Sequence, residues 1–273
     1  MSLLEKAKYL LRTHRIHPKK SLGQNFMIEP AFFSSMADGV SLDQNDVTLD
    51  AGAGLGFLTR FLADKCMTVL AVETDKVIAR VLREQIADIS NVKIIEGNVL
   101  KTDVPTFNKV VSIPPYNISS HLLLWLFNKQ FDSAALIIQK EFAYRLAASV
   151  GTEDYGWIAV LTYYYAEVEL LEKVPKSAFH PQPKVDSIIT RLVPRKPKPF
   201  RLKDETSFRR MVQSLFTQRN RKVRNAILPY LRGTCMQPKG KAARNAELLP
   251  FRDVRVRELA PQKFGVLANA IVD

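Results

Sequence analysis

The stretch VTLDAGAGLGFLTRFLA, residues 47–63, decides the fold. It begins as an apolar run of strand length and ends as a segment with helical spacing of apolar residues. Between the two lie Gly52, Gly54 and Gly56. Glycine lets a backbone take positive φ and approach a ligand closely. A strand, a glycine-rich turn and a helix in this order predict an α/β fold with a ligand at the turn.

Apolar runs of strand length recur on both sides of a second helical segment, residues 76–88. They fall at 68–74, 92–97, 109–113 and 133–139. Short apolar strands that alternate with helices predict a parallel sheet with helices on both faces. The alternating segments 158–174 and 186–194 predict longer antiparallel strands at one edge.

The segment RLVPRKPKPFRLKDE, residues 191–205, predicts a domain boundary because its three prolines disfavour both helix and central strand. We expect one domain over 1–194 and a small helical domain over 195–273, with helices at 207–231 and 258–272. All of the net charge of +13 lies in 195–273, which hold 19 Lys and Arg against six Asp and Glu. This imbalance indicates a polyanionic partner, either nucleic acid or an acidic membrane surface.

The glycine turn and two strand ends predict a nucleoside cofactor. The spacing is G-x-G-x-G and not the dinucleotide pattern G-x-G-x-x-G, and Asp50 would repel a pyrophosphate at this turn. A positively charged cofactor such as S-adenosylmethionine fits better. Glu73 ends the next strand, where an acid can accept hydrogen bonds from ribose hydroxyls, and Asn98 with Val99 follows the third strand, where an adenine edge is expected. The alternatives are a nicotinamide-dependent oxidoreductase and a turn that serves only helix packing.

Cysteine and histidine content argues against other kinds of site. Cys66 and Cys235 are far apart in the sequence and have no partner at metal-ligand spacing, so neither a disulfide nor a zinc site is expected. His14 and His17 are expected to be solvated or to face phosphate, with a metal site as a remote alternative. The opening residues 1–15 predict an amphipathic helix, and no apolar run is long enough to span a bilayer. We expect a cytoplasmic monomer without a bound metal.

The strand at 109–113 ends in the segment SIPPYNISS, residues 112–120. Pro114 and Pro115 cannot donate ladder hydrogen bonds, so the strand must stop and present Tyr116 at its end. Ligands of α/β folds bind at such strand ends. Ser112 is polar, but strand alternation points its side chain to the opposite face.

Together these motifs resemble the ribosomal RNA adenine N6-dimethyltransferase family over nearly the whole chain. Its blocks are matched by KKSLGQNFM, LDAGAGLGFLT, VETD, IIQKEFAYRLAAS, GTEDYG, VPKSAFHPQPKVDS and LFTQRNRKVRNAI. The resemblance implies a Rossmann-like, seven-stranded class I methyltransferase sheet followed by a small helical domain. It also implies S-adenosylmethionine as cofactor and the small-subunit rRNA of a pre-ribosomal particle as substrate, dimethylated at two adjacent adenosines near its 3′ end.

The resemblance assigns further roles. The first block implicates Gln24, Asn25 and Met27 in cofactor binding, and Phe179 joins Tyr116 as an aromatic face for the flipped base. The basic C-terminal residues implied in RNA binding are Arg219, Arg221, Lys222 and Arg224. On a continuous helix, these four could not share one face.

Two positions differ from the family pattern. Where the family has an amide that accepts the amino hydrogens of adenine, this chain has Ile113, and Asn98 replaces a more common Asp. The main-chain carbonyl of Pro114 remains as an acceptor. The sequence therefore predicts an rRNA dimethyltransferase with Ile113, Pro114, Pro115, Tyr116 and Phe179 at its catalytic centre. The alternative is an RNA-binding ribosome-assembly factor of the same fold with weakened or lost catalysis.

Overall fold

The computed structural model describes residues 1–272 of the 273-residue chain, and its contacts divide these residues into two compact units. The first unit comprises residues 1–143 and 168–194, and the second comprises residues 144–167 and, within the described chain, 195–272. The chain passes from the first unit to the second for the last time after residue 194, which is where the sequence predicts the domain boundary. Residues 144–167, expected in the first domain, make their contacts within the second unit.

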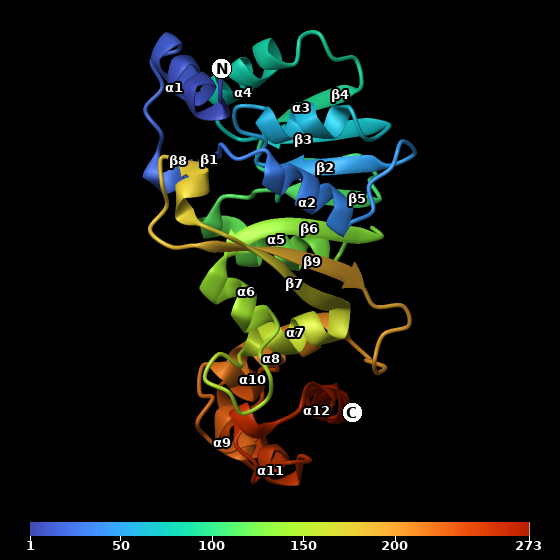
Figure 1. Cartoon of the computed structure of the whole chain (residues 1–273). Coiled ribbons are helices and arrows are strands. Elements are labelled where there is room, and N and C mark those ends of the chain that lie inside the picture. Colours follow the sequence, from blue (N-terminus) through green and yellow to red (C-terminus); the bar gives the residue numbers. More distant parts are fainter. Residues whose placement is uncertain (273) are drawn as a thin grey trace. The chain divides into compact units, whose positions relative to one another are not determined.

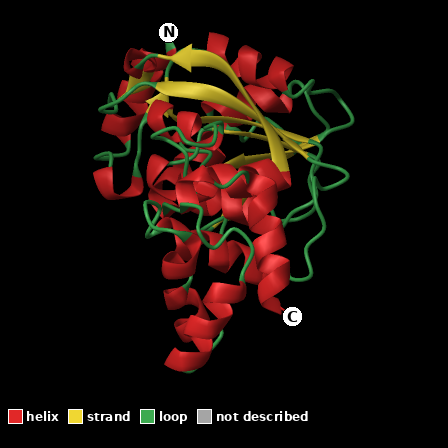
Figure 2. Cartoon of the chain, turned by 90° about the horizontal axis from the view of Figure 1, so that it is seen from below, coloured by secondary structure: helices red, strands yellow, loops and turns green. Residues whose placement is uncertain are grey.

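The first unit is built on one seven-stranded mixed sheet in the order β4-β3-β2-β5-β6-β9-β7, which Figures 1 and 2 show as a twisted layer. Its strands are β2 (Val47–Ala51), β3 (Thr68–Glu73), β4 (Val92–Glu96), β5 (Lys109–Ser112), β6 (Ser133–Gln139), β7 (Ala166–Val174) and β9 (Ser187–Pro194). The first five are parallel, and β9 pairs antiparallel with β6. The expected seven-stranded Rossmann-like sheet is confirmed.

The helices of the first unit are α1 (Leu3–Thr13), α2 (Ala31–Gly39), α3 (Phe57–Ala63), α4 (Lys76–Gln85) and α5 (Ser119–Leu126), while α6 (Lys140–Leu146) crosses from the first unit into the second. Three of them, α3, α4 and α5, connect parallel strands of this sheet, and α1 and α2 precede its first strand. A separate two-stranded ribbon pairs β1 (Phe26–Met27) with β8 (Phe179–His180). The expected helix at the start of the chain is confirmed. It begins with a capping box, in which Ser2 Oγ accepts from the Glu5 N–H and the Ser2 N–H donates to the Glu5 carboxylate.

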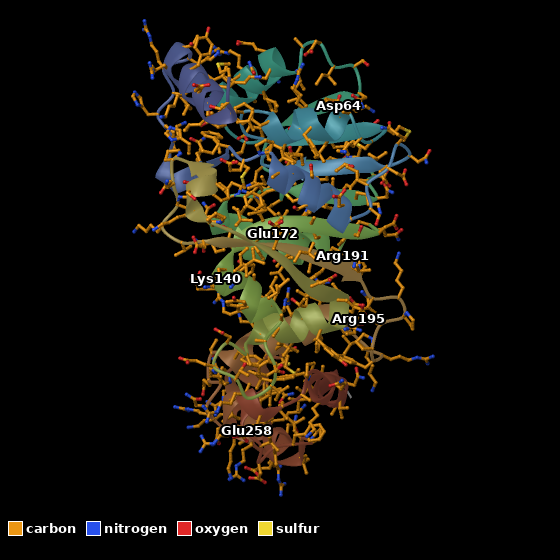
Figure 3. All side chains as sticks on the ribbon, in the orientation of Figure 1. Asp64, Lys140, Glu172, Arg191, Arg195 and Glu258 are labelled. Atoms are coloured by element: carbon orange, nitrogen blue, oxygen red, sulfur yellow. The ribbon has the colours of Figure 1, made fainter. Side chains whose placement is uncertain are left out.

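The core of the first unit lies between the sheet and the helices α2 and α3. Phe33 and Met36 of α2 and Leu62 of α3 are at most 2% exposed and pack against apolar residues of the central strands. At the other edge of the sheet, Arg191 of β9, labelled in Figure 3, pairs with Glu169 of β7 at 3.2 Å. The apolar side chains of the central strands are therefore buried, and this ion pair joins the last two strands in the order of the sheet.

The second unit is helical. Its helices are α7 (Trp157–Tyr165), α8 (Glu205–Phe216), α9 (Val223–Ala226), α10 (Leu228–Gly233), α11 (Lys239–Leu248) and α12 (Pro261–Val272). Asp204 caps α8 by accepting from the N–H groups of Thr206 and Ser207. Phe208 and Phe264 are fully buried in its core.

Two expectations for this part of the chain are wrong. Residues 158–165, expected as part of a strand over 158–174, lie in α7, because burial on nearly every side removes the polar face that would reveal a helical period. The expected helix over 207–231 is interrupted after Phe216, where Lys222 forms an antiparallel bridge with Arg255. The four basic residues 219, 221, 222 and 224 therefore do not share one helix.

Candidate active site

The site lies at the carboxyl ends of the parallel strands, where the strand order reverses between β2 and β5. The chain runs from β2 outward to β3 and β4, and returns to the other side of β2 as β5. At this switch point Ser112 is fully buried, and its Oγ accepts from the Ala51 N–H at 2.8 Å and donates to the Leu49 carbonyl at 3.1 Å. Ser112 therefore belongs to the sheet, as strand alternation predicted. Crevices at such reversals are the usual ligand sites of open α/β sheets.

A cavity of about 180 Å³ opens at these strand ends. It brings together twelve of the residues expected at the site: Gln24, Asn25, Gly52, Gly54, Glu73, Asn98, Val99, Ile113, Pro114, Pro115, Tyr116 and Phe179. Phe26, Thr74 and Asn117 also line the cavity and were not expected from the sequence. Residues that are up to 155 positions apart in the chain therefore converge on one cavity.

Gly52 and Gly54 meet the cavity with left-handed backbones, at φ of +90° and +57°. A Cβ on Gly52 would lie 3.0 Å from Pro115 Cδ, and a Cβ on Gly54 would lie 3.2 Å from the Phe26 ring. Both distances are shorter than ordinary van der Waals contact. These two glycines therefore keep the turn close to the opposite wall and leave space for a ligand.

Gly56 lies elsewhere. It precedes α3 with φ of +84°, does not line the cavity, and would place a Cβ 2.7 Å from Leu82 Cδ1. We expect Gly56→Ala to lower the free energy of unfolding by about 2–4 kcal/mol, from left-handed strain and overpacking. Urea unfolding measures this loss, and calorimetry at a temperature where the variant is folded should show unchanged cofactor affinity. A lost affinity in the folded variant would place Gly56 in the binding site after all.

Glu73 connects the glycine turn to the next strand end. Its Oε2 accepts from the Gly54 N–H at 2.9 Å, and its Oε1 accepts from the Asp75 N–H at 2.8 Å. Burial raises the pKa of this carboxyl, while the backbone hydrogen bonds oppose the rise. Each carboxylate oxygen keeps a second lone pair, so Glu73 can hold the turn and still accept hydrogen bonds from a ligand.

Asp50 is fully buried at the end of β2 and accepts a hydrogen bond from Thr59 Oγ1 at 2.7 Å. It lines a smaller cavity of about 40 Å³ that shares Asn25, Gly52 and Ile113 with the larger one. Burial raises the pKa of Asp50 from 3.8 to about 7, and the nearby Glu73 carboxylate adds to the rise. A cationic ligand in the adjoining cavity would favour the charged form.

This pKa makes stability depend on pH. Between about pH 4 and pH 7 the folded state holds a proton that the unfolded state has released, so the free energy of unfolding falls as pH rises through this window. We expect Asp50→Asn to remove most of this fall, which amounts to a few kcal/mol at about 1.4 kcal/mol per pH unit. Urea unfolding at pH 5 and pH 8 measures it.

The matched control is Asp64→Asn, because Asp64 is exposed (labelled in Figure 3) and should leave the pH dependence unchanged. Glu73, whose pKa is also raised by burial, accounts for a remaining slope of the same sign. An Asp50→Asn protein with the full wild-type pH dependence would contradict this assignment.

The N-terminal segment is held over the cavity by Asp75, which sequence reasoning missed. The Asp75 carboxylate accepts from Lys19 Nζ at 2.8 Å, from Gln24 Nε2 at 3.1 Å and from the Val77 N–H at 3.0 Å. Hydrogen bonds from Lys19 and Val77 lower the pKa of Asp75 against the opposing effect of burial. The available signal was an Asp directly before a helix, which is a typical N-cap. Its second role depends on a segment more than 50 residues away.

The strand-end residues form the opposite wall. The Tyr116 hydroxyl lies 2.7 Å from Ser187 Oγ, so its ring is fixed at the cavity. Phe179 also reaches the wall but is only 2% exposed and packs in the core. Within the described part of the chain, the Pro114 carbonyl receives no hydrogen bond. Ile113 presents only alkyl carbons to both cavities.

Met27, expected among the cofactor-binding residues, does not line the larger cavity. It is 4% exposed, packs in the main core and borders only the smaller cavity. Its strand position explains the difference, because side chains alternate along β1 and its neighbour Phe26 lines the larger cavity.

The four basic residues expected to bind RNA have different surroundings in the second unit. Arg219 donates to the Glu153 and Thr152 carbonyls at 2.8 and 3.1 Å. Lys222 and Arg224 both pair with Asp253, at 3.4 and 3.0 Å. Arg221 is exposed, and its side chain has no partner among residues 1–272. RNA binding by these residues stays a prediction.

Other site types find no support in residues 1–272. No group of three or more His, Cys, Asp or Glu is placed there to hold a metal ion. Cys66 and Cys235 are free thiols, and Cys66 is buried in the main core. No helix of the described chain is long and apolar enough to cross a membrane.

Comparison with known proteins gives consistent results. Residues 15–246 match the family model of ribosomal RNA adenine dimethylases. The chain is 38% identical over 252 residues to a probable ribosomal RNA small subunit methyltransferase A of Methanosarcina barkeri, covering 92% of this chain and 86% of that one. A ribosomal RNA small subunit methyltransferase A of a Geobacillus strain is 31% identical, with 97% and 96% covered.

Solved structures show the same fold. A dimethyladenosine transferase from Plasmodium falciparum superposes with a TM-score of 0.75 at 24% identity, over 89% of this chain and 95% of that one. The 23S rRNA methyltransferase ErmE superposes with a TM-score of 0.64 at 28% identity, over 91% and 100%.

Proposed function

The chain belongs to the ribosomal RNA adenine dimethylase family, and from this premise we propose that it dimethylates N6 of two adjacent adenosines near the 3′ end of small-subunit rRNA, with S-adenosylmethionine as methyl donor. One observation carries the proposal for this chain. The glycine turn, Glu73 and the strand end at residues 113–116 line a single cavity at the switch point of the sheet. The family match favours this activity over a nicotinamide-dependent oxidoreductase.

The cavity fits the cofactor. Gly52 and Gly54 leave space that a Cβ would fill, and the Glu73 carboxylate can accept hydrogen bonds from the ribose hydroxyls. Asn98 and Val99 suit the adenine ring, and Gln24 and Asn25 close the cavity from the N-terminal segment. When bound, S-adenosylmethionine supplies an electrophilic methyl group on a sulfonium.

The chain's own residues would prepare the adenine. Its amino nitrogen is a poor nucleophile because the lone pair is delocalised into the ring, so the amino hydrogens must be held by acceptors as the nitrogen pyramidalises. The Pro114 carbonyl is one such acceptor and is free to serve. Tyr116 offers an aromatic face to a base that has left its stack, and Phe179 borders the same cavity although it is only 2% exposed.

Ile113 favours a second candidate. Without an amide at this position the protein has one acceptor fewer for the amino group, which suits an RNA-binding assembly factor that keeps the fold and transfers methyl groups slowly or not at all. The family relationship favours the enzyme, and the two functions differ in a single product.

The deciding experiment incubates the protein with methyl-labelled S-adenosylmethionine and immature small subunits, and then digests the rRNA for N6,N6-dimethyladenosine. We expect labelled dimethyladenosine above a no-enzyme control. Absence of product from a protein that still binds cofactor and subunits would favour the assembly factor.

A further inference from the structure

The first 19 residues carry two groups of basic side chains. Three of these side chains have partners in the fold: Lys6 lies over the Phe57 ring, His14 pairs with Glu84 at 3.2 Å, and Lys19 pairs with Asp75 at 2.8 Å. The other four are Lys8, Arg12, Arg15 and His17, which are exposed and form no side-chain hydrogen bond or ion pair among the described residues, although Lys8 lies close enough to Glu5 to help lower the pKa of its carboxyl. The zero net charge of residues 1–194 therefore conceals a local excess of positive charge.

The four unpartnered side chains line one groove of about 490 Å³, together with Leu11, Ile16 and His180. We call it the basic groove. No acidic residue lines it. The pKa of His180 is lowered, first by burial and then by the nearby charge of Lys8, so β8 and α1 face each other across the groove. Of the three permanent cations, Lys8 lies near the Glu5 carboxylate, whereas Arg12 and Arg15 pair with no carboxylate among the described residues. The groove therefore keeps an excess of positive charge that suits an anionic chain.

Arg15 occupies a backbone conformation that favours glycine. It follows the end of α1 with φ of +50°, and the Ile16 N–H reaches back to the Leu11 carbonyl at 2.8 Å. Glycine is the usual residue at this helix-terminating position, because a Cβ there costs about 1–2 kcal/mol. The Arg15 side chain makes no contact that would offset this cost, since it has no partner among the described residues. Strain of this kind is typical of functional positions.

The groove adjoins the active-site cavity through the two-stranded ribbon of β1 and β8. Phe179 lines the cavity, and the next residue, His180, lines the groove. Successive side chains of a strand point to opposite faces, so β8 is a wall that the two spaces share. Figure 1 shows α1 and this ribbon at the same side of the first unit.

We propose that the basic groove binds the sugar–phosphate backbone of the RNA strand that flanks the target adenosine. The inference rests on the proposed function, because it takes the occupant of the cavity to be a base of that strand. Lys8, Arg12 and Arg15 contact phosphates, and the short wall at residues 179–180 separates the flipped base from its flanking nucleotides. RNA contact is therefore not confined to the basic C-terminal unit.

The test compares RNA binding by Arg15→Gly and by the triple variant Lys8→Gln/Arg12→Gln/Arg15→Gly. The probe is a fluorescently labelled 20-nucleotide single-stranded RNA with two adjacent adenosines, titrated by anisotropy at several salt concentrations. Each lost phosphate contact lowers the salt slope by about 0.7, which is about fourfold in affinity at 0.15 M salt. We expect about fourfold weaker binding for Arg15→Gly. For the triple variant we expect about 50-fold weaker binding and a slope reduced by about 2.

Arg15→Gly separates this role from a structural one, because glycine relieves the backbone strain and should leave the melting temperature equal or higher. Lys93→Gln, at an exposed position of β4 outside the groove, is the control for charge loss. Affinity for S-adenosylmethionine should stay unchanged in all variants. If the triple variant binds RNA as tightly as Lys93→Gln, the proposal is overturned. If the groove proposal fails in this way but the wild-type protein makes dimethyladenosine, the proposed function still holds. A wild-type protein without product would contradict the function, whatever the groove binds.

Discussion

Ile113→Asn should raise the rate of methyl transfer by about 10²–10³, by analogy with the rate lost when one preorganised hydrogen-bond group is removed from an active site. Asparagine would restore an amide oxygen at the end of β5, beside the Pro114 carbonyl. Two acceptors could then hold the two amino hydrogens of adenine. Single-turnover methylation of immature subunits, with enzyme in excess, measures the chemical step directly.

The matched control is Ile113→Val, which keeps an alkyl side chain at the wall of both cavities and should leave the rate close to wild type. Cofactor affinity measured by calorimetry should be similar for all three proteins, because the expected gain lies in the transition state and not in binding. An Ile113→Asn rate equal to or below that of Ile113→Val would show that another group of this chain already accepts the second hydrogen. Asn25 would then be the first residue to test, since it shares both cavities with Ile113.

The parallel core of the fold was predictable because buried parallel strands are continuous apolar runs with a length that few other elements share. Each of β2 to β6 lies within or beside an apolar run that the sequence marks. The failures have different physical causes. Residues 158–165 have apolar or aromatic side chains on nearly all sides of the helix, so the sequence shows no helical period. The break after Phe216 is followed by the bridge between Lys222 and Arg255, a contact distant in sequence that no local propensity reveals.

The site residues also divide into those that were predictable from the sequence and those that were not. Residues that follow strands or form the glycine turn were predictable, because topology alone brings strand ends together. Asp75 and Ser187 were missed, since each acts through a residue distant in sequence, Lys19 and Gln24 for the first and Tyr116 for the second. Gly56 was expected at the ligand, but it does not line the cavity and lies against Leu82, so its part in binding stays a prediction. A glycine pattern shows where the backbone is unusual and leaves open what occupies the space.

Glu73 gives the sharpest test of the cofactor site, because Glu73→Gln is not conservative here. The two carboxylate oxygens accept from two different backbone N–H groups, those of Gly54 and Asp75. A glutamine has one acceptor oxygen, so its NH₂ must face one of these donors and leave it unpaired. An unpaired buried donor costs about 1–3 kcal/mol. We therefore expect a lower melting temperature and a glycine turn that is less firmly held.

The larger effect is on cofactor affinity, which should fall by about 10²–10⁴ for Glu73→Gln. Hydrogen bonds from two ribose hydroxyls to a charged group contribute about 1.5–3 kcal/mol each, and the displaced turn removes further contacts. Calorimetric titration with S-adenosylmethionine measures the loss. Glu96→Gln is the matched control, because Glu96 lies opposite Glu73 in the β3–β4 register but is exposed and pairs with Arg83. Equal affinities in the two variants would remove Glu73 from the binding site and leave it only the role of holding the turn.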